Sequence, residues 1–461
     1  MRERSAPLDD TIVAIITPPG EGGIAALRLA GPDALAIANQ HLRSRAGEPI
    51  ALDPFHLRYA IFHSSNGQNI DEVTAVSMPH GHSYTGLEQV EIFCHGGRMA
   101  ARLILEELMS SGARAAEPGE FTRLAFINGR IDLARAEAVA ELIAANSHAS
   151  FRASREHLLG AYSEHVAELR DQIVRVTSEV EASIDFPEEE ISPASQAEVT
   201  HQIESVVDRI DQLLQTYQGG RIIAEGFSVA ISGRPNAGKS SLFNLLLRKE
   251  RALVNPIAGT TRDYLSEWIE LDGYAVNLID TAGIRIKGGK IEALGIERAR
   301  KIIKDADLVL WMCDLTRRSW RKELEADLKN LPSEKTILLL NKIDLAKEKS
   351  ETSTDVVPFI RLSARTGAGL GELTGCLSRE IHKRMPDLTS GLVVTSARHK
   401  QKLGGAVKAL RSARIKNQRG ESPELVAFEL RQATLCLDEI TGKVYTEEIL
   451  GRIFGKFCIG K

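Results

Sequence analysis

Hydrophobic positions change their spacing three times along the chain, and each change predicts a different kind of structure. Over residues 1–118, short strand-like stretches rich in β-branched and aromatic residues surround one helical stretch. TIVAIIT, FHLRYAIF and QVEIFC, which begin at residues 11, 55 and 89, predict strands, and MAARLILEELMSSG predicts a helix that ends at Gly112. We therefore predict an N-terminal α+β domain over residues 1–118.

The second region, residues 119–220, carries apolar residues every three or four positions, which is the spacing of one helix face. Ser195 followed by Glu198 is typical of a capping box at the start of a helix. The two apolar stripes, separated by FPEEEISP, are Val166, Leu169, Ile173, Val176, Val180 and Ile184, and then Val199, Ile203, Val206, Ile210 and Leu213. They indicate helix–helix packing rather than a binding site.

Residues 221–385 alternate between short apolar runs and helical stretches, as expected of a doubly wound α/β unit. FSVAISG, VNLID, ADLVLWMCD and TILLLNKID are short enough for buried parallel strands. Helical spacing returns over residues 386–461. We predict a multidomain chain with an N-terminal α+β domain, a discontinuous all-α helical domain (119–220 and 386–461) and an inserted α/β P-loop G domain (221–385). A closing movement of the inserted domain would then be transmitted to the helices that precede it and to those that follow it in the sequence.

Composition narrows the class of protein. Of 461 residues, 43% are apolar and 26% charged, which is ordinary for a globular protein, and the net charge of −4 restricts any nucleic-acid contact to a local patch. The five cysteines are scattered without a C-x-x-C, which argues against a disulfide framework or structural zinc. The first residues lack an apolar signal region, and no apolar run approaches the roughly 20 residues that span a bilayer. We expect a cytoplasmic protein that does not enter a membrane.

A phosphate-binding motif lies at the start of the α/β region. G-x-x-x-x-G-K-[ST] is matched by Gly233, Arg234, Pro235, Asn236, Ala237, Gly238, Lys239 and Ser240, and Ser241 follows. The glycines let backbone N–H groups face phosphate oxygens, Lys239 reaches the β- and γ-phosphates, and the Ser240 hydroxyl ligates Mg²⁺. The alternative is a plain glycine-rich turn, but the motif follows a predicted strand and opens a predicted helix.

Further nucleotide motifs follow in the order expected of a GTPase. GTTRD offers Thr261, next to Thr260, as a second metal-binding hydroxyl, and DTAG offers Asp280 for Mg²⁺ and Gly283 for the γ-phosphate. NKID places Asn341, Lys342 and Asp344 after a later strand, and Ser363 with Ala364 suits the loop around the guanine O6. The two carboxylate oxygens of Asp344 match the N1–H and N2–H₂ donors of guanine, a pair that adenine lacks. We predict GTP and Mg²⁺ as ligands.

One residue departs from the usual hydrolytic machinery. Ile284 follows the Asp-x-x-Gly motif, where Ras-like GTPases carry a glutamine that orients the attacking water. Because isoleucine cannot do this, hydrolysis must recruit another group. The Asn236 amide is a candidate ligand for K⁺, which would act where an arginine finger acts; the alternative is that it only stabilises the loop. Glu292 is the nearest acid that could orient the water, and its alternative is a solvated helix residue.

The whole set of motifs resembles the MnmE (TrmE) family of tRNA-modification GTPases. The resemblance rests on TIVAIITPPGEGGIAALRLAG, SYTG and VEIFCHGG, PGEFTRLAFINGRIDLARAEAV, GRPNAGKSSLFN, GTTRD, DTAGIR, GIERA and the final GRIFGKFCIGK, and it covers essentially the full chain. It implies a K⁺-stimulated GTPase that forms a homodimer through its N-terminal domain. With the flavoprotein MnmG (GidA), in a heterotetrameric complex, such a protein adds an aminomethyl or carboxymethylaminomethyl group to C5 of the wobble uridine (U34) of certain tRNAs. The one-carbon unit comes from a tetrahydrofolate in its 5-formyl or 5,10-methylene form.

The resemblance also implies roles for individual residues. It implies K⁺ binding at Asn236 and the adjoining switch segment, with Asn255, Ile257 and Thr260 in that segment, and it makes Glu292 the catalytic glutamate. A folate site would comprise Arg28, Glu91, Arg130 and Lys461. Chemistry supports part of this, since a pterin presents the same amide-plus-amine edge as guanine to Glu91, and Arg28 and Arg130 suit folate carboxylates. No G-x-G-x-x-G occurs, so the flavin step belongs to the partner.

Several positions leave more than one interpretation open. Arg130 stands where the family usually has lysine, and Leu87 replaces an acidic residue. Cys458 either carries the one-carbon unit as a thiolate or packs the tail. The basic run from Arg398 to Arg419 is either a tRNA contact or a solvated helix face. Rival functions are a regulatory GTP switch in ribosome assembly and a non-catalytic GTP-dependent scaffold.

Overall fold

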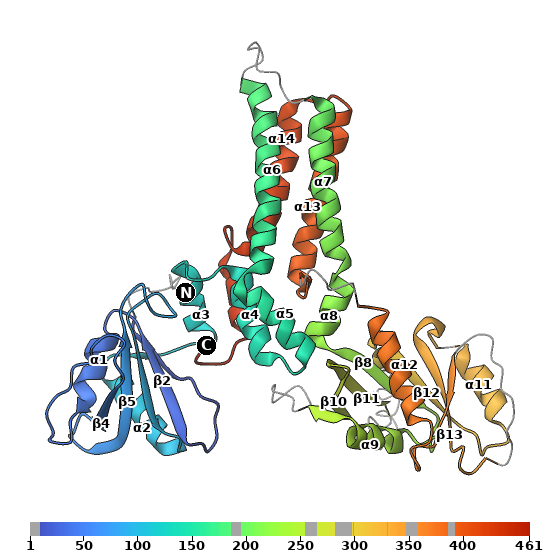
Figure 1. Ribbon diagram of the computed structural model, residues 1–461, viewed down its shortest axis with the longest axis horizontal. Helices are drawn as coiled ribbons and strands as arrows, with labels where there is room; N and C mark the ends of the chain where they lie inside the picture. Colours follow the sequence, from blue (N-terminus) through green and yellow to red (C-terminus); the bar gives the residue numbers. More distant parts are fainter. Residues whose placement is uncertain are drawn as a thin grey trace. The chain divides into compact units, whose positions relative to one another are not determined.

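The computed structural model describes residues 10–185, 195–253, 265–281, 297, 299–329, 331–346, 358–385 and 392–461. Its elements form two compact units, Met1–Ala140 with Asp438–Lys461, and Glu141–Leu437 (Figure 1). The predicted fold class is confirmed, because an α+β region, helices from two stretches of the chain and an α/β domain between these stretches are all present. The predicted domain boundaries at residues 118, 220 and 385 stay a prediction.

The first unit is built on a mixed sheet. Its described strands run in the order β3-β4-β5-β6-β2-β1-β7, with β7 parallel to β1 and the other neighbours antiparallel. Their bounds are β1 (Ile12–Ile15), β2 (Ile24–Ala30), β3 (Leu42–Arg43), β4 (Arg58–His63), β5 (Asn69–Met78), β6 (Gln89–His95) and β7 (Arg114–Ala115). Helices α1 (Ala34–His41) and α2 (Arg98–Ser110) supply Ile37, Ile104 and Leu108 to the core on one face, against Leu27 and Ile92 of the sheet.

The other face of this sheet carries polar residues and a smaller apolar cluster. Ile12, Ala14 and Ala30 pack with Phe121 of α3 (Glu120–Ile127). Side chains alternate between the two faces of a strand, so Arg28 shares this second face with Ala30. Around α3 pack α4 (Leu133–Ala144), α15 (Glu447–Phe454) and Phe457. The end of the chain is thereby held close to the polar face of the sheet.

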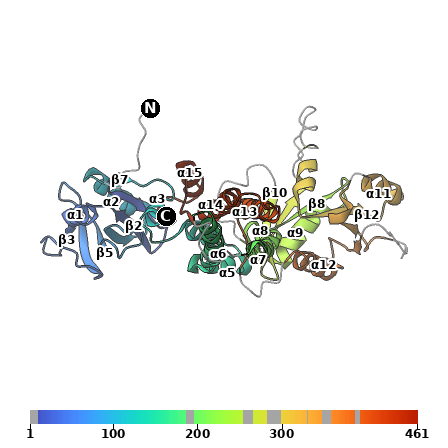
Figure 2. The same cartoon turned by 90° about the horizontal axis from the view of Figure 1, so that it is seen from above.

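The second unit contains a bundle made from helices on both sides of the α/β region. Long helices from the two stretches lie side by side in Figures 1 and 2. The long helices are α6 (Ala161–Asp185), α7 (Gln196–Gln215), α13 (Ala397–Gln418) and α14 (Pro423–Thr441), and the shorter helices α5 (His148–Leu159) and α8 (Tyr217–Glu225) contact α6 and α7. Most of the predicted apolar stripes of α6 and α7 are buried, and the hydroxyl of Ser195 accepts a hydrogen bond from the Glu198 amide as the N-cap of α7.

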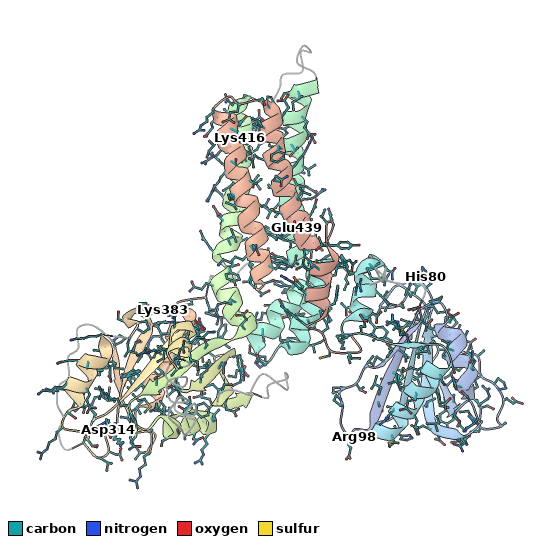
Figure 3. All side chains as sticks on the ribbon, turned by 180° about the vertical axis from the view of Figure 1, so that it is seen from behind. His80, Arg98, Asp314, Lys383, Lys416 and Glu439 are labelled. Atoms are coloured by element: carbon teal, nitrogen blue, oxygen red, sulfur yellow. The ribbon has the colours of Figure 1, made fainter. Side chains whose placement is uncertain are left out.

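The basic run from Arg398 to Arg419 is largely engaged within the bundle. Arg411 pairs with Asp211 (2.6 Å) and Arg414 with Glu204 (3.1 Å), both across to α7. Lys416, labelled in Figure 3, pairs with Glu429 of α14 (2.9 Å), and Lys400 lies over the Tyr217 ring. These contacts connect α13 to α7, α8 and α14, while Lys408 and Arg419 are exposed, so both interpretations of the run, a tRNA contact and a solvated helix face, stay predictions.

The α/β region forms a second sheet whose described strands run in the order β14-β13-β12-β8-β11-β10-β9. β8, β11, β12, β13 and β14 are parallel, and β9 and β10 are antiparallel additions at one side. The strands are β8 (Phe227–Gly233), β9 (Arg251–Leu253), β10 (Leu265–Leu271), β11 (Tyr274–Asp280), β12 (Leu308–Asp314), β13 (Thr336–Asn341) and β14 (Phe359–Arg361). Helices α9 (Lys239–Lys249) and α12 (Leu370–His382) share one core, and α11 (Trp320–Leu328) packs in another. Because parallel strands end at the same edge, Gly233, Asp280, Asp314 and Asn341 meet there.

The segment that leads from the α/β region back to the bundle, at Val393 and Val394, packs closely against the bundle helices. The Val394 amide donates to the Thr216 hydroxyl (3.0 Å), and a ring nitrogen of His157 lies 2.9 Å from the Val393 carbonyl oxygen. Gly220 of α8 has no room for a side chain, because a Cβ there would lie 2.3 Å from the Val394 carbonyl oxygen.

We predict that Gly220→Ala lowers the free energy of unfolding by about 1–3 kcal/mol, since α8 and the segment at Val394 must move apart. Thermal unfolding followed by circular dichroism measures this. Gly404→Ala in α13 is the matched control, because a Cβ there meets nothing within 4 Å. It should be neutral or stabilising, as alanine favours a helix by about 1 kcal/mol over glycine. Equal losses of unfolding free energy in both variants would contradict the proposed close packing of Gly220 against Val394.

Candidate functional site

The loop between β8 and α9 has the backbone of a phosphate-binding loop. Gly233, Asn236 and Gly238 adopt positive φ angles of 138°, 63° and 103°. A Cβ on Gly233 would lie 2.4 Å from the Met312 carbonyl oxygen, and one on Gly238 would lie 2.2 Å from Nδ2 of Asn341. Both glycines are therefore required by the turn and by close neighbours. The loop ends at the N-terminus of α9, where free N–H groups and the helix dipole favour an anion.

Lys239 and Ser240, the first residues of α9, lie at the loop as predicted from the motif. The buried ammonium of Lys239 donates hydrogen bonds to the carbonyl oxygens of Gly233 (2.9 Å) and Arg234 (2.8 Å). The Ser240 hydroxyl donates to Oδ2 of Asp280 (3.0 Å), at the end of β11. A hydroxyl and a carboxylate side by side are the kind of oxygen ligands that Mg²⁺ takes in nucleotide sites. Ser241, one position on, is exposed.

Asn341 joins three loops at this edge of the sheet. Its Nδ2 donates to the Ala237 carbonyl oxygen of the phosphate-binding loop (2.7 Å), and its Oδ1 accepts from the Ala364 amide (2.9 Å). The side chain is 1% exposed. Ser363, beside Ala364, is also buried, and its hydroxyl accepts from the Thr366 amide (3.2 Å). Asn341 thus sets the distance between the phosphate loop and the loop after β14.

The remaining predicted base contacts flank Asn341. Asp344 is exposed and free to face a ligand. Lys342, at a φ of 70°, pairs with Oδ2 of Asp314 (2.6 Å) at the end of β12. Burial raises the pKa of Asp314, but hydrogen bonds from Lys342 and Thr316 lower it by more than burial raises it. The pKa of Asp314 therefore lies below its usual value. The carboxylate therefore stays ionised and fixes the course of the loop that carries Asp344.

Arg234 and Asn236 differ in their surroundings. Arg234 donates two hydrogen bonds to Asp327 of α11 (3.0 and 2.9 Å), which holds the phosphate loop against that helix. The side chain of Asn236 is exposed and makes no hydrogen bond to the described part of the chain. Both residues, with Pro235 and Asp314, line a cavity of about 730 Å³. The alternative role of Asn236, stabilising the loop, stays open, because its φ of 63° is a backbone conformation that asparagine adopts more readily than most residues.

Several predicted site residues lie outside the described residues. They are Asn255, Ile257, Thr260, Thr261, Gly283, Ile284 and Glu292.

A second candidate site lies on the polar face of the N-terminal sheet. Arg28 of β2 and Glu91 of β6 are direct cross-strand partners. The guanidinium reaches Oε1 of Glu91 from both Nε (2.9 Å) and Nη2 (2.8 Å), and it lies over the rings of Tyr84 and Phe121. Burial raises the pKa of the Tyr84 phenol, whose oxygen lies 3.0 Å from the Thr122 hydroxyl. A half-buried ion pair between aromatic rings is a suitable place for a flat polar ligand.

Of the other residues predicted for this site, one makes a side-chain contact and two make main-chain contacts near it. Arg130 is exposed, and its Nη1 donates to the Gly81 carbonyl oxygen (3.0 Å). Lys461 reaches the site through its backbone, because its carbonyl oxygen accepts from the Phe121 amide (3.2 Å). Cys458 is exposed, and its carbonyl oxygen accepts from the Gly119 amide (3.4 Å). The tail is thus anchored by main-chain hydrogen bonds beside the Arg28–Glu91 pair.

Sequence reasoning missed some residues of both sites. Asp327 of α11, which holds Arg234, carried no motif signal. Tyr84, Phe121 and Gln89 surround the Arg28–Glu91 pair. Gln89 had a usable signal, since it lies two residues before Glu91 on a predicted strand and therefore shares its face.

The sheet with its phosphate loop, the adjacent Ser240 and Asp280 oxygens and the Asn-Lys-x-Asp loop defines a P-loop GTPase domain. The family model "GTP-binding protein TrmE N-terminus" matches residues 11–130, and "MnmE helical domain" matches residues 133–458. The chain belongs to the MnmE family of tRNA modification GTPases.

Similar proteins extend over the whole chain. The tRNA modification GTPase MnmE of Akkermansia muciniphila is 41% identical over 98% of this chain and 99% of that protein. The proteins of the same name from Protochlamydia amoebophila and Aquifex aeolicus are 39% and 36% identical, over 98% of this chain and 98% and 100% of their own lengths. Among solved structures, the G domain of the T. maritima FeoB iron transporter covers 34% of this chain and 98% of that chain, at 29% identity with a TM-score of 0.26. Within the described residues, no helix has the length and apolar character needed to cross a membrane.

We predict that Asn341→Ala and Asp344→Ala, two changes in one motif, have different effects. Asn341→Ala leaves two buried backbone groups without partners, so it should lower the free energy of unfolding by about 2–4 kcal/mol. Asp344→Ala removes an exposed side chain and should leave stability within about 0.5 kcal/mol while abolishing tight guanine binding. All three tryptophans, Trp268, Trp311 and Trp320, lie in residues 221–385, so their fluorescence in urea follows unfolding of this region. A large stability loss in Asp344→Ala would contradict these roles.

Proposed function

We propose that this chain hydrolyses GTP as one component of wobble-uridine modification in tRNA. With a flavin-dependent partner, MnmG (GidA), it adds a (carboxymethyl)aminomethyl group to C5 of U34, using a one-carbon unit from a tetrahydrofolate. The observation that carries the proposal is full-length similarity to tRNA modification GTPases combined with a formed phosphate loop. A cytoplasmic homodimer that joins MnmG in a heterotetramer completes the proposal.

The nucleotide would be held by groups that the fold brings to one edge of the sheet. Backbone N–H groups of the loop and of the first turn of α9, other than at Pro235, would face the phosphates, and Lys239 would exchange its two carbonyl partners for phosphate oxygens. Ser240 and Asp280, 3.0 Å apart, fit Mg²⁺, and we propose Thr261 as a further ligand. Asp344 accepts from guanine, while Asn341, Lys342, Ser363 and Ala364 shape the base pocket.

We propose that K⁺ takes the place of the missing glutamine and arginine finger. The exposed amide of Asn236, with Asn255, Ile257 and Thr260, would hold the ion. When bound, K⁺ would supply positive charge where negative charge develops on the phosphates. Glu292 is proposed to orient the attacking water.

The polar face of the N-terminal sheet fits a tetrahydrofolate. Oε1 of Glu91 is occupied by Arg28, whereas Oε2 has no partner among the described residues. A carboxylate oxygen free to accept from an N–H edge, beside the aromatic rings of Tyr84 and Phe121, suits a pterin. When bound, the folate would supply the one-carbon unit. Arg130 would pair with its carboxylates, and Lys461 would complete the site. Cys458, exposed beside it, stays a candidate for handling the one-carbon unit.

We predict that GTP hydrolysis rises steeply with K⁺ and not with Na⁺, because a cation of the right size must replace a catalytic side chain. The effect of an arginine finger, about 10³–10⁵ in rate, sets its upper range. Phosphate release in matched K⁺ and Na⁺ buffers measures it. Equal rates in the two salts would exclude the cation mechanism.

We predict that Asn236→Ala removes this K⁺ response but leaves GTP affinity nearly intact, since its side chain bonds no described residue. Titration with a fluorescent GTP analogue, beside the hydrolysis assay, separates the two effects. Pro235→Ala, one position earlier on the same loop, is the matched control and should keep the response. A loss of nucleotide affinity in Asn236→Ala would mark the residue as structural.

We predict that Glu91→Ala weakens binding of 5-formyltetrahydrofolate at least about 10-fold, the effect of losing one hydrogen bond to a charged group. Isothermal titration calorimetry measures the affinity. Glu72→Ala, on the neighbouring strand β5, is the control for loss of an acid from this sheet and should bind as the unaltered chain does. Undiminished binding by Glu91→Ala would place the folate elsewhere.

A further inference from the structure

Gln89 is a buried polar residue that stability alone does not explain. Its side chain is 1% exposed, on the same face of β6 as Glu91. The amide nitrogen donates to Oε1 of Glu91 (3.1 Å) and contacts the sulfur of Met78 (3.8 Å). Oε1 of Gln89 is buried and has no hydrogen-bond partner among the described residues.

An apolar side chain would be better at this position if packing were the only requirement. A buried carbonyl oxygen without a donor is unfavourable, whereas an apolar group of the same shape leaves nothing unsatisfied. Rotating the amide does not help, because its oxygen would then face the Glu91 carboxylate. The hydrogen bond to Glu91 is the feature that sets Gln89 apart from an apolar residue.

The hydrogen bonds to Glu91 are unequally divided between its two oxygens. Oε1 accepts from Nε and Nη2 of Arg28 and from Nε2 of Gln89, at 2.9, 2.8 and 3.1 Å. Oε2 has no partner among the described residues. Arg28 approaches from β2 and Gln89 from two residues earlier on β6, so together they fix the plane of the carboxylate. The group is thereby held with one oxygen satisfied and the other available.

We propose that Gln89 is a positioning residue that orients Glu91, so that Oε2 accepts from the N–H edge of a pterin. This inference rests on the folate site put forward above and assigns Gln89 a part in its affinity. Gln89 acts through Glu91 and does not touch the ligand. The fold keeps an unsatisfied amide in the interior because that amide holds the recognition group in place.

The test replaces Gln89 by methionine, an unbranched side chain of similar length that lacks the amide. We expect Gln89→Met to weaken binding of 5-formyltetrahydrofolate roughly 10- to 100-fold, as for loss of a hydrogen bond to a charged group. We also expect the thermal midpoint of the chain to stay the same or rise. A purely structural role would instead lower the midpoint. Unchanged affinity in Gln89→Met would overturn the proposal.

Ser77→Ala is the matched control. Ser77 lies on β5 opposite Val90, so it faces the other side of the same sheet, and its hydroxyl is also buried without a hydrogen-bond partner in the part of the chain that the structure describes. Ser77→Ala should therefore raise or preserve the thermal midpoint with no change in folate affinity. A loss of affinity in this variant comparable to that of Gln89→Met would mean that any core change disturbs the site, and would overturn the specific role of Gln89.

A double-mutant cycle with Glu91→Gln distinguishes failure of the inference from failure of the folate site. If Gln89 acts through Glu91, adding Gln89→Met to Glu91→Gln should weaken binding no further. If Glu91→Gln alone binds the folate normally, the proposed folate site itself is wrong. If Glu91→Gln loses affinity and Gln89→Met keeps it, only the positioning role fails.

Discussion

The two hydrogen bonds of the Asn341 amide are the contact on which the nucleotide site depends. Nδ2 holds the phosphate loop at Ala237, and Oδ1 holds the following loop at Ala364. The glycine at 238 exists in part to admit this amide, since a Cβ there would collide with Nδ2. One buried side chain therefore sets the spacing between the part of the site that would hold phosphates and the part that would hold the base. Lys342 and Asp314 extend the same scaffold outward to the exposed Asp344.

The two candidate sites use the same recognition chemistry in different surroundings. Guanine and a pterin both present an amide N–H beside an amine, and we propose that each binds to a carboxylate, Asp344 or Glu91. Asp344 is exposed on a loop whose course is fixed by neighbours. Glu91 is half-buried on a strand and fixed by direct hydrogen bonds to one of its oxygens. Preorganisation comes from the loop in one site and from charge pairing across strands in the other.

Local patterns in the sequence predicted most of the helices and strands. They could not predict which side chains pair across long distances in the sequence. The 3.6-residue stripes identified α6 and α7, and the strand–loop–helix order identified the phosphate loop, because these signals lie within one element. The acceptors of Arg234 and the acids that pair with Arg411 and Arg414 are 93, 200 and 210 positions away, and no spacing rule reaches them. For the same reason, the ion pairs that connect the basic run of α13 to α7 and α14 could not be predicted from the sequence. Gln89 was within reach of strand alternation, but its unpaired oxygen was not.

The central claim, that a GTPase with this architecture modifies the wobble uridine, is tested most directly on tRNA itself. Mass spectrometry of nucleosides from purified tRNA should be compared between cells that make this protein, cells that lack it, and lacking cells that regain the intact chain. The account predicts that the C5-substituted uridine disappears with the protein and returns with the chain. Equal amounts of that nucleoside in all three would contradict it.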